Sequence, residues 1–146
     1  MSIHLLDVNV LLALAWPQHI HHAPAHQWFG RAAVNGWATC PLTELAFIRI
    51  SSNPKIIAAA VTPREARDVL KEILALSHHH FWPDDVQPIE AEGLASIALV
   101  GHREVNDAYL IELTQRHDGK VATFDRGLTE LAAARGDKNR VTFIKA

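Results

Sequence analysis

The sequence predicts an α/β fold, with a central, mainly parallel sheet of about four to five strands flanked by helices. The first observation is that short apolar runs alternate with longer helical patterns along the chain, as in parallel strands joined by helices. The second is that 146 residues, 49% of them hydrophobic and 21% charged, suit a globular domain that buries its own core. A single domain over residues 1–146 is therefore expected, without a repeat or linker.

The first fifty residues are expected to form two buried strands and three helices. Pro17 ends the first helix because proline has no backbone N–H, and Thr43 is expected to cap the third with its hydroxyl. In chain order these elements are strand Ile3–Leu6, helix Val10–Ala15, helix His26–Val34, strand Trp37–Cys40 and a helix through about Ser51.

The clearest helical pattern covers Pro63–Leu76. Thr62 and Glu65 have the spacing of a capping box, in which each side chain bonds a backbone N–H near the position of the other. Pro63 takes the first helical position, where no backbone N–H is needed. Apolar residues recur at every step of the helical spacing, so this helix is expected to pack one face against the core.

The second half of the chain is expected to continue the alternation of strands and helices. Asn106 is a candidate cap for one helix, and Gly119 and Gly136 follow the ends of two helices. The expected elements are strand His80–Trp82, helix Glu90–Val100, helix Asp107–Arg116, strand Lys120–Phe124, helix Gly127–Ala134 and strand Arg140–Ile144.

Composition argues against several classes of protein. Cys40 is the single cysteine, which excludes an intrachain disulfide and fits a reducing cytoplasm. The apolar run over residues 3–14 contains Asp7 and is too short for a membrane span, so no membrane segment is expected. The formal charge of −2 does not favour a nucleic-acid-binding surface. This objection weakens if the acids gather in one metal-binding pocket, because the remaining surface is then more basic.

Four acidic residues occupy related places in this pattern. Asp7 and Asp125 each follow a strand, whereas Glu44 and Asp107 each lie in the first turn of a helix. In a parallel sheet these positions meet at one edge, where sites form beyond the carboxyl ends of strands. Four carboxylates repel one another unless cations neutralise them, and oxygen ligands suit Mg²⁺ or Mn²⁺. Each acid also has an ordinary structural explanation, for example as a cap or first-turn residue, and Asp7 fits such an explanation least because apolar residues surround it on both sides.

Four motifs in this order, "LLDVNVLLAL", "TELAFIRISSNP", "VNDAYLIELT" and "ATFDRGL", resemble the PIN-domain ribonucleases. The resemblance covers nearly the whole chain and is closest to the VapC-type toxins of toxin–antitoxin pairs. It implies a PIN-like three-layer fold and an acidic catalytic and metal-binding set of Asp7, Glu44, Asp107 and Asp125.

The same resemblance implies supporting roles for other residues. Asn9 occupies the place of a small polar residue beside the first acid, and Thr123 is expected to orient the last acid or a metal-bound water. Arg49 and Asn53 are also typical of the family, and Arg126 adjoins the last acid. Arg49 and Arg126 are therefore candidate contacts to RNA or to an antitoxin.

The activity that the resemblance implies is cleavage of RNA by a Mg²⁺- or Mn²⁺-dependent endoribonuclease, with tRNA, rRNA or mRNA as the target. A metal-activated water is the expected nucleophile. The resemblance also implies a cognate VapB-type antitoxin, a homodimer and a location in the cytoplasm, without a membrane.

Other chemistries stay open at this point. His19, His22 and His26 have helical spacing and His78–His80 form a tract, which leaves zinc binding or histidine acid–base chemistry as alternatives. An aspartate-nucleophile phosphatase is a further alternative, although position 9 is Asn rather than the second Asp of that pattern. The last alternative is a catalytically inactive PIN fold that binds RNA or assembles with partners.

Overall fold

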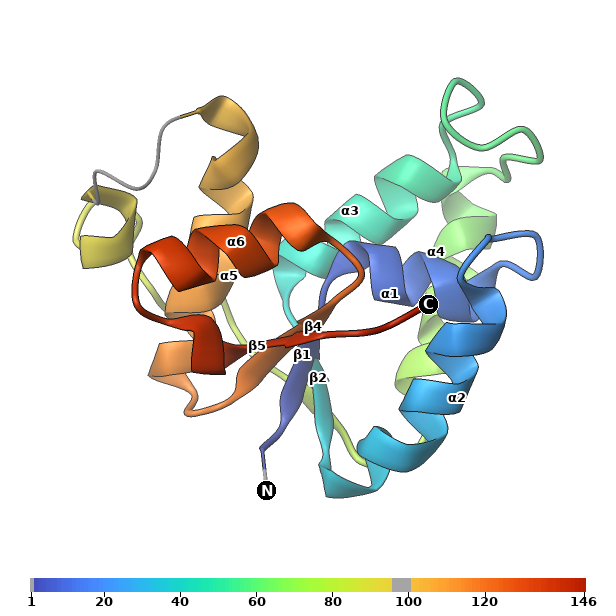
Figure 1. Cartoon of the computed structure of the whole chain (residues 1–146). Coiled ribbons are helices and arrows are strands. Elements are labelled where there is room, and N and C mark those ends of the chain that lie inside the picture. The colour runs from blue at the N-terminus through green and yellow to red at the C-terminus, as the bar shows by residue number, and fades with distance from the viewer. Residues whose placement is uncertain (1, 96–100) are drawn as a thin grey trace.

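The computed structural model describes residues 2–95 and 101–146, and a five-stranded sheet lies at its centre (Figure 1). All neighbouring strands are parallel, in the order β3-β2-β1-β4-β5. The strands are β1 (His4–Leu6), β2 (Trp37–Thr39), β3 (His79–Phe81), β4 (Lys120–Thr123) and β5 (Val141–Phe143). The predicted α/β class and parallel sheet are confirmed.

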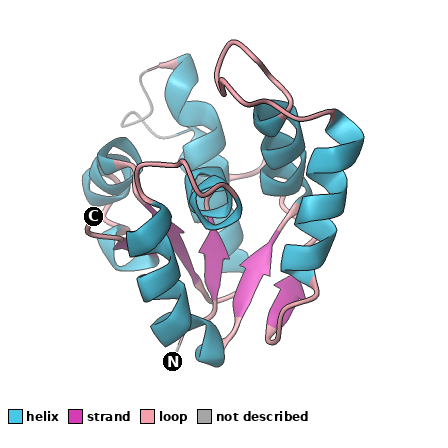
Figure 2. Ribbon diagram, turned by 90° about the vertical axis from the view of Figure 1, so that its right-hand side faces the viewer, coloured by secondary structure: helices cyan, strands magenta, loops and turns pink. Residues whose placement is uncertain are grey.

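Helices cover both faces of the sheet, so the fold has three layers (Figure 2). The described helices are α1 (Val8–Ala15), α2 (His22–Ala32), α3 (Pro41–Ser51), α4 (Pro63–Leu74), α5 (Val105–Arg116) and α6 (Arg126–Ala134). Successive side chains of a strand point to opposite faces. Leu5 therefore packs with α5 and α6 in one core, and Leu6 packs with α1 to α4 in the other.

The strand order creates one point where the direction of winding reverses. From β1 the chain moves outward through β2 to β3, then returns to the other side of β1 as β4 and continues to β5. The carboxyl ends of β1 and β4 thus flank the topological switch point, the usual place for a site in such sheets. The backbone N–H of Asp7 donates to the carbonyl of Ala122 at 3.0 Å and joins the two strand ends there.

Several predicted helix starts are wrong by a few residues. The first helix begins at Val8 rather than Val10, because Asp7 caps it. The second begins at His22 rather than His26. The third begins at Pro41 after Cys40, and the hydroxyl of Thr43 instead accepts from the N–H and donates to the carbonyl of Cys40.

Two further predictions in the second half need correction. A 3₁₀ turn, His102–Glu104, leads directly into α5, so Asn106 lies inside the helix and is not its cap. The helix expected over Glu90–Val100 is wrong in its described part, which holds only a 3₁₀ turn at Glu92–Ala95. Its remainder, residues 96–100, lies outside the described residues.

The capping box of α4 is confirmed, with the Thr62 hydroxyl accepting from the Glu65 N–H at 3.1 Å. No helix in the described part of the chain has the length and apolar character needed to cross a membrane.

Candidate active site at the carboxyl ends of β1 and β4

Asp7 is a buried carboxylate between the end of β1 and the start of α1, with 7% of its surface exposed. Its Oδ1 accepts from the Val8 N–H at 2.8 Å, and its Oδ2 accepts from the Thr123 hydroxyl at 2.8 Å. The Asn9 amide donates to the same Oδ2 at 3.3 Å. Burial raises the pKa of Asp7, and the bonds from Thr123 and Val8 oppose that rise.

Asn9 and Thr123 link this carboxylate to the end of β4. The Asn9 amide donates to the Thr123 hydroxyl at 3.2 Å and accepts from the Phe124 N–H at 3.2 Å. The Thr123 hydroxyl also accepts from the Asp125 N–H at 2.9 Å. Thr123 therefore holds the carboxylate of Asp7 and the backbone of Asp125, rather than the carboxylate of Asp125 as the sequence suggested. This network fixes the positions of two strand ends that are far apart in the sequence.

Asp107 and Asp125 line one cleft of about 350 Å³, together with Arg103 and Glu104. Burial raises the pKa of Asp107, and together with the negative charges of Asp7, Asp125 and Glu104 it brings that pKa to about 7. Three of the four predicted acids thus act on one another electrostatically at the switch point. Asp125 is also the cap of α6, because its Oδ1 accepts from the Gly127 N–H at 2.8 Å.

Glu44, the fourth predicted acid, has a separate set of contacts in the first turn of α3. Its Oε2 accepts from the Thr39 hydroxyl at 2.7 Å, at the end of β2. Because that hydroxyl gives its proton to Glu44, the His79 Nε2 at 2.7 Å is the donor to Thr39. Glu44 is not among the charges that raise the pKa of Asp107.

The donor chemistry of these carboxylates suits Mg²⁺ or Mn²⁺, because every ligand atom is a hard oxygen. A cation would also relieve the repulsion that raises the pKa of Asp107. As the side chains stand, the described residues bring no three Asp, Glu, His or Cys side chains close enough to hold a metal ion. The residues match Mg²⁺ or Mn²⁺ in the chemistry of their donor atoms.

Three residues near the acids were not predicted from the sequence. Glu104 lies three residues before Asp107, and this spacing on a helix is a signal that could have found it. Thr39 and His79 support Glu44, but they are 40 residues apart and belong to different strands. A pattern within a short stretch of sequence cannot predict contacts between residues so far apart.

The histidines predicted as possible zinc ligands have other contacts. The ring of His22 bonds the carbonyl of Ala13 at 2.7 Å, and the ring of His26 bonds the carbonyl of Leu14 at 2.9 Å. These carbonyls belong to the last turn of α1, where they have no partner within the helix. Both histidines therefore cap the C-terminal end of α1 from the first turns of α2.

The two candidate arginines lie on different elements. Arg49 is exposed in the last turn of α3. Arg126 is exposed at the first position of α6, and its guanidinium carbon lies 5.2 Å from the centre of the Phe143 ring. The Cys40 thiol is buried, and burial raises its pKa to about 11, so it is not a reactive nucleophile.

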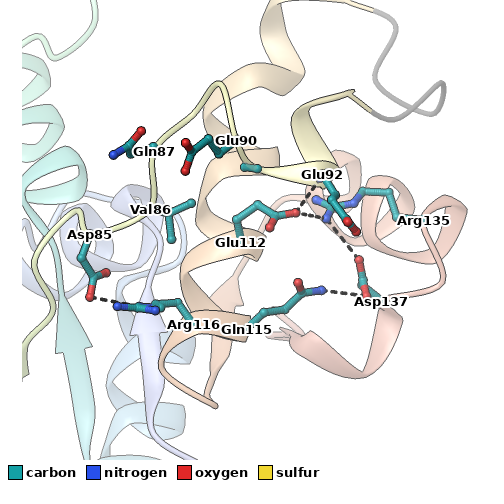
Figure 3. A pocket seen from close by; sticks show the side chains of 12 residues that line it. Asp85, Val86, Gln87, Glu90, Glu92, Glu112, Gln115, Arg116, Arg135 and Asp137 are labelled. Carbon is teal, nitrogen blue, oxygen red and sulfur yellow. Dashed lines mark hydrogen bonds and ion pairs between the residues drawn. The ribbon is translucent and has the colours of Figure 1, made fainter.

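A larger hollow of about 710 Å³ lies between α5 and the segment after β3 (Figure 3). Several of its charged side chains are paired with one another: Arg135 bonds Glu112 and Asp137, and Arg116 bonds Asp85. None of the predicted acids lines this hollow within the described residues. The ion pairs around this hollow join α5 to the neighbouring segments, and the hollow is not the candidate active site.

Comparison with known proteins gives the family. The model of the PIN domain matches residues 4–134. Ribonuclease VapC39 of Mycobacterium tuberculosis is 46% identical over 130 residues, which cover 89% of this chain and 94% of the relative. Ribonuclease VapC38 of the same organism is 46% identical over 131 residues, covering 90% and 91%.

A solved structure described as FitAB bound to an IR36 DNA fragment has a similar fold. Its TM-score is 0.63 with 19% identity, and the match covers 90% of this chain and 91% of that chain. At this identity the likeness shows the fold alone. Together the matching domain model, the VapC relatives and the carboxylates at the switch point show that the chain belongs to the PIN-domain family, among its VapC-type members.

Proposed function

We propose that this protein is a divalent-metal-dependent endoribonuclease, the toxin of a VapBC-type toxin–antitoxin pair, which hydrolyses tRNA, rRNA or mRNA. The observation that carries the proposal is the placement of acids at the switch point, where Asp107 and Asp125 line one cleft and Asp7 is bonded to Thr123 at the end of β4. The proposal is supported by relatives that are named ribonucleases and match this chain almost end to end.

In this proposal Asp7, Asp107, Asp125 and Glu44 hold Mg²⁺ or Mn²⁺. The chemistry that the metal supplies when bound is activation of a water and stabilisation of the leaving 3′-oxygen in an in-line displacement. Products with a 5′-phosphate and a 3′-hydroxyl are expected.

The remaining roles belong to the supporting side chains. Asn9 and Thr123 fix the carboxylate of Asp7, so that its free lone pairs point in a constant direction. Thr39 holds one carboxylate oxygen of Glu44 in the same manner. Arg49 and Arg126 are proposed contacts to the phosphates of RNA or to the antitoxin.

A VapB-type antitoxin and a second copy of the chain are the proposed protein partners. Exposed apolar side chains support such partners, since contiguous apolar patches mark interaction sites. A hollow of about 460 Å³ is lined by Trp16, Ile20, Ile56 and Ile57, with 85% of Ile20 and 61% of Ile56 exposed. Light scattering on the purified chain, alone and with the product of the adjacent reading frame, tests both associations.

The activity is tested with purified chain, total RNA and either Mg²⁺, Mn²⁺ or EDTA. We expect cleavage with a metal only, and a loss of about 10²-fold or more in Asp7→Asn, because a carboxylate ligand is replaced by a neutral amide. Asp68→Asn is the matched control, since Asp68 is a mostly exposed carboxylate on α4. Equal cleavage by the wild-type chain and Asp7→Asn would refute the proposal, and mapping of new 5′ ends identifies the RNA that is cut.

A catalytically inactive PIN fold that binds RNA is the second candidate function. It is favoured by one observation, that the described acids do not form a ready metal cage. Calorimetric titration with Mn²⁺ separates the two candidates. Binding that Asp107→Asn abolishes supports the enzyme, and no binding up to millimolar Mn²⁺ supports the inactive fold.

A further inference from the structure

A separate hollow adjoins the candidate active site at the carboxyl ends of β4 and β5. It measures about 630 Å³, and its lining residues are His21, Phe124, Arg126, Phe143, Ile144, Lys145 and Ala146. We propose that this hollow is a nucleotide subsite, which holds one unpaired base and its phosphate next to the cleaved bond of single-stranded RNA. The inference rests on the proposed function, which it extends from a cleavage site to a substrate-binding surface.

The hollow presents planar side chains of the kind on which bases stack. The His21 ring stacks on the Phe124 ring, with centroids 4.6 Å apart and 16° between the planes. The Arg126 guanidinium lies over the Phe143 ring, 5.2 Å from its centroid. Aromatic rings and guanidinium groups are the platforms that single-stranded nucleic acids use, because every base has a π-face.

The charge of the hollow is complementary to RNA. Arg126 and Lys145 are exposed cations among its lining residues, and no Asp or Glu side chain is among its described lining residues. This is a local departure from a chain whose formal charge is −2. A phosphate bound here is stabilised by both cations, whereas a cationic or neutral apolar ligand gains nothing from them.

The position of the hollow connects it to the chemistry. Phe124 and Arg126 line the hollow, and Asp125, the residue between them, lines the acidic cleft with Asp107. Consecutive α-carbons are only about 3.8 Å apart, so the two depressions lie on either side of one residue. A strand with its cleaved phosphate at the acids therefore has its neighbouring nucleotide within reach of the hollow.

The test measures RNA affinity without catalysis. A fluorescently labelled oligouridine is titrated with the full chain in EDTA, and the dissociation constant is read from anisotropy at several salt concentrations. Phe143→Leu is expected to weaken binding about tenfold through lost stacking. The plot of log affinity against log salt has a negative slope. Arg126→Gln is expected to make that slope shallower by about 0.7, the value for one phosphate contact on a single strand.

Two variants outside the hollow serve as matched controls. Phe81→Leu changes a half-exposed phenylalanine on β3, the opposite edge strand of the sheet. Arg67→Gln changes an exposed arginine on α4. Both are expected to bind oligouridine as the wild-type chain does. Because Arg126 is exposed, Arg126→Gln keeps the test valid even if Phe143→Leu unfolds.

The outcomes separate this inference from the proposed function. If the wild-type chain cleaves RNA but both hollow variants bind oligouridine normally, the subsite is refuted and the nuclease stands. If the variants lose affinity as expected but no metal supports cleavage, the subsite stands and the nuclease fails. An equal loss of affinity for fully paired RNA in Phe143→Leu would also refute the subsite, because a paired base is not free to stack.

Discussion

Asp7 illustrates how one carboxylate is kept at the edge of an apolar core. Its surroundings oppose ionisation through burial and favour it through hydrogen bonds from Val8 and Thr123. Asn9 adds a neutral donor to the same carboxylate oxygen. The carboxylate is thus fixed in orientation, while none of the side chains that bond it among the described residues carries a positive charge. At the scale of the residue, this is the arrangement that a bound cation would stabilise.

The pKa of Asp107 predicts how stability changes with pH in the metal-free protein. Its folded pKa of about 7 lies above its ordinary value of 3.8, so the folded state holds the proton more tightly than the unfolded state. Stability should therefore fall as pH rises from about 4 to 7, and the loss should be complete above pH 7.

Asp107→Asn removes this titration. Allowing for solvent screening of a partly exposed group, we expect the variant to be more stable than the wild-type chain at pH 8 by about 1–2 kcal/mol. That difference raises the melting temperature by roughly 2–8 °C in a chain of this size. The gain should vanish near pH 4, and Mg²⁺ should reduce it by stabilising the wild-type chain only. Thermal unfolding in EDTA across this pH range measures it, and a constant difference would contradict the assignment.

Asn9→Asp tests the hydrogen-bond network around Asp7. A carboxylate at position 9 has no N–H to donate to Asp7 or Thr123, and it places a like charge beside a buried one. We expect the free energy of unfolding at pH 7 to fall by about 1–3 kcal/mol, with a smaller loss at pH 4. Urea unfolding at the two pH values measures the effect. Asn53→Asp, at an exposed turn, is the control.

At the scale of the element, the ends of α1 are fixed by different parts of the chain. Asp7 caps the first turn, and the rings of His22 and His26 bond carbonyls of the last turn. A helix of only eight residues has few internal bonds, so contacts at its ends form a large part of its stability. The position of Asp7 thus depends on a helix that tertiary contacts hold at both ends.

The histidine caps give a prediction that also distinguishes capping from zinc binding. His22→Ala and His26→Ala should each lower the free energy of unfolding by about 0.5–1.5 kcal/mol, because each leaves a carbonyl of α1 without its donor. His102→Ala, in the exposed turn before α5, should change stability by less than about 0.5 kcal/mol. Chemical unfolding measures these values. A large loss of stability on adding a zinc chelator to the wild-type chain would contradict the capping role.

At the scale of the whole molecule, Arg135 connects three segments around the hollow of Figure 3. Its guanidinium bonds Glu112 on α5 and Asp137 after α6, and Glu112 also accepts from the Gly93 N–H. The Arg135 side chain is only 5% exposed, so this ion pair is removed from water. The segment that contains Gly93 is thereby attached to the α5–α6 layer.

Arg135→Met should therefore destabilise the protein strongly. It leaves Glu112 as an uncompensated buried charge, which costs about 3–5 kcal/mol. The double variant Arg135→Met/Glu112→Leu should recover most of that loss. Arg116→Gln, which removes an exposed ion pair to Asp85, should cost less than about 1 kcal/mol. Denaturant unfolding of the wild-type chain and these three variants measures the losses, and equal losses for Arg135→Met and Arg116→Gln would contradict the prediction.

Helix positions could be predicted where the signal is local. The capping box of Thr62 and Glu65 lies within four consecutive residues and placed the start of α4 correctly. The expected start of α3 is wrong because Thr43 is the third residue of the helix and bonds back to the N-cap residue Cys40, rather than being the N-cap itself. The helix expected over Glu90–Val100 had no capping signal, and its described part forms a 3₁₀ turn attached to Glu112.

The sequence by itself determined the α/β class and the four acids at strand ends and helix starts, because spacing and local hydrogen bonds are properties of short segments. Only the tertiary structure decided which side chains meet. Thr123 bonds Asp7 across 116 positions, and His79 reaches Thr39 across 40. Such contacts follow from the strand order β3-β2-β1-β4-β5, which places distant segments side by side. A local pattern carries no information about that order, and so it could not identify the side chains that bond Asp7 and Glu44.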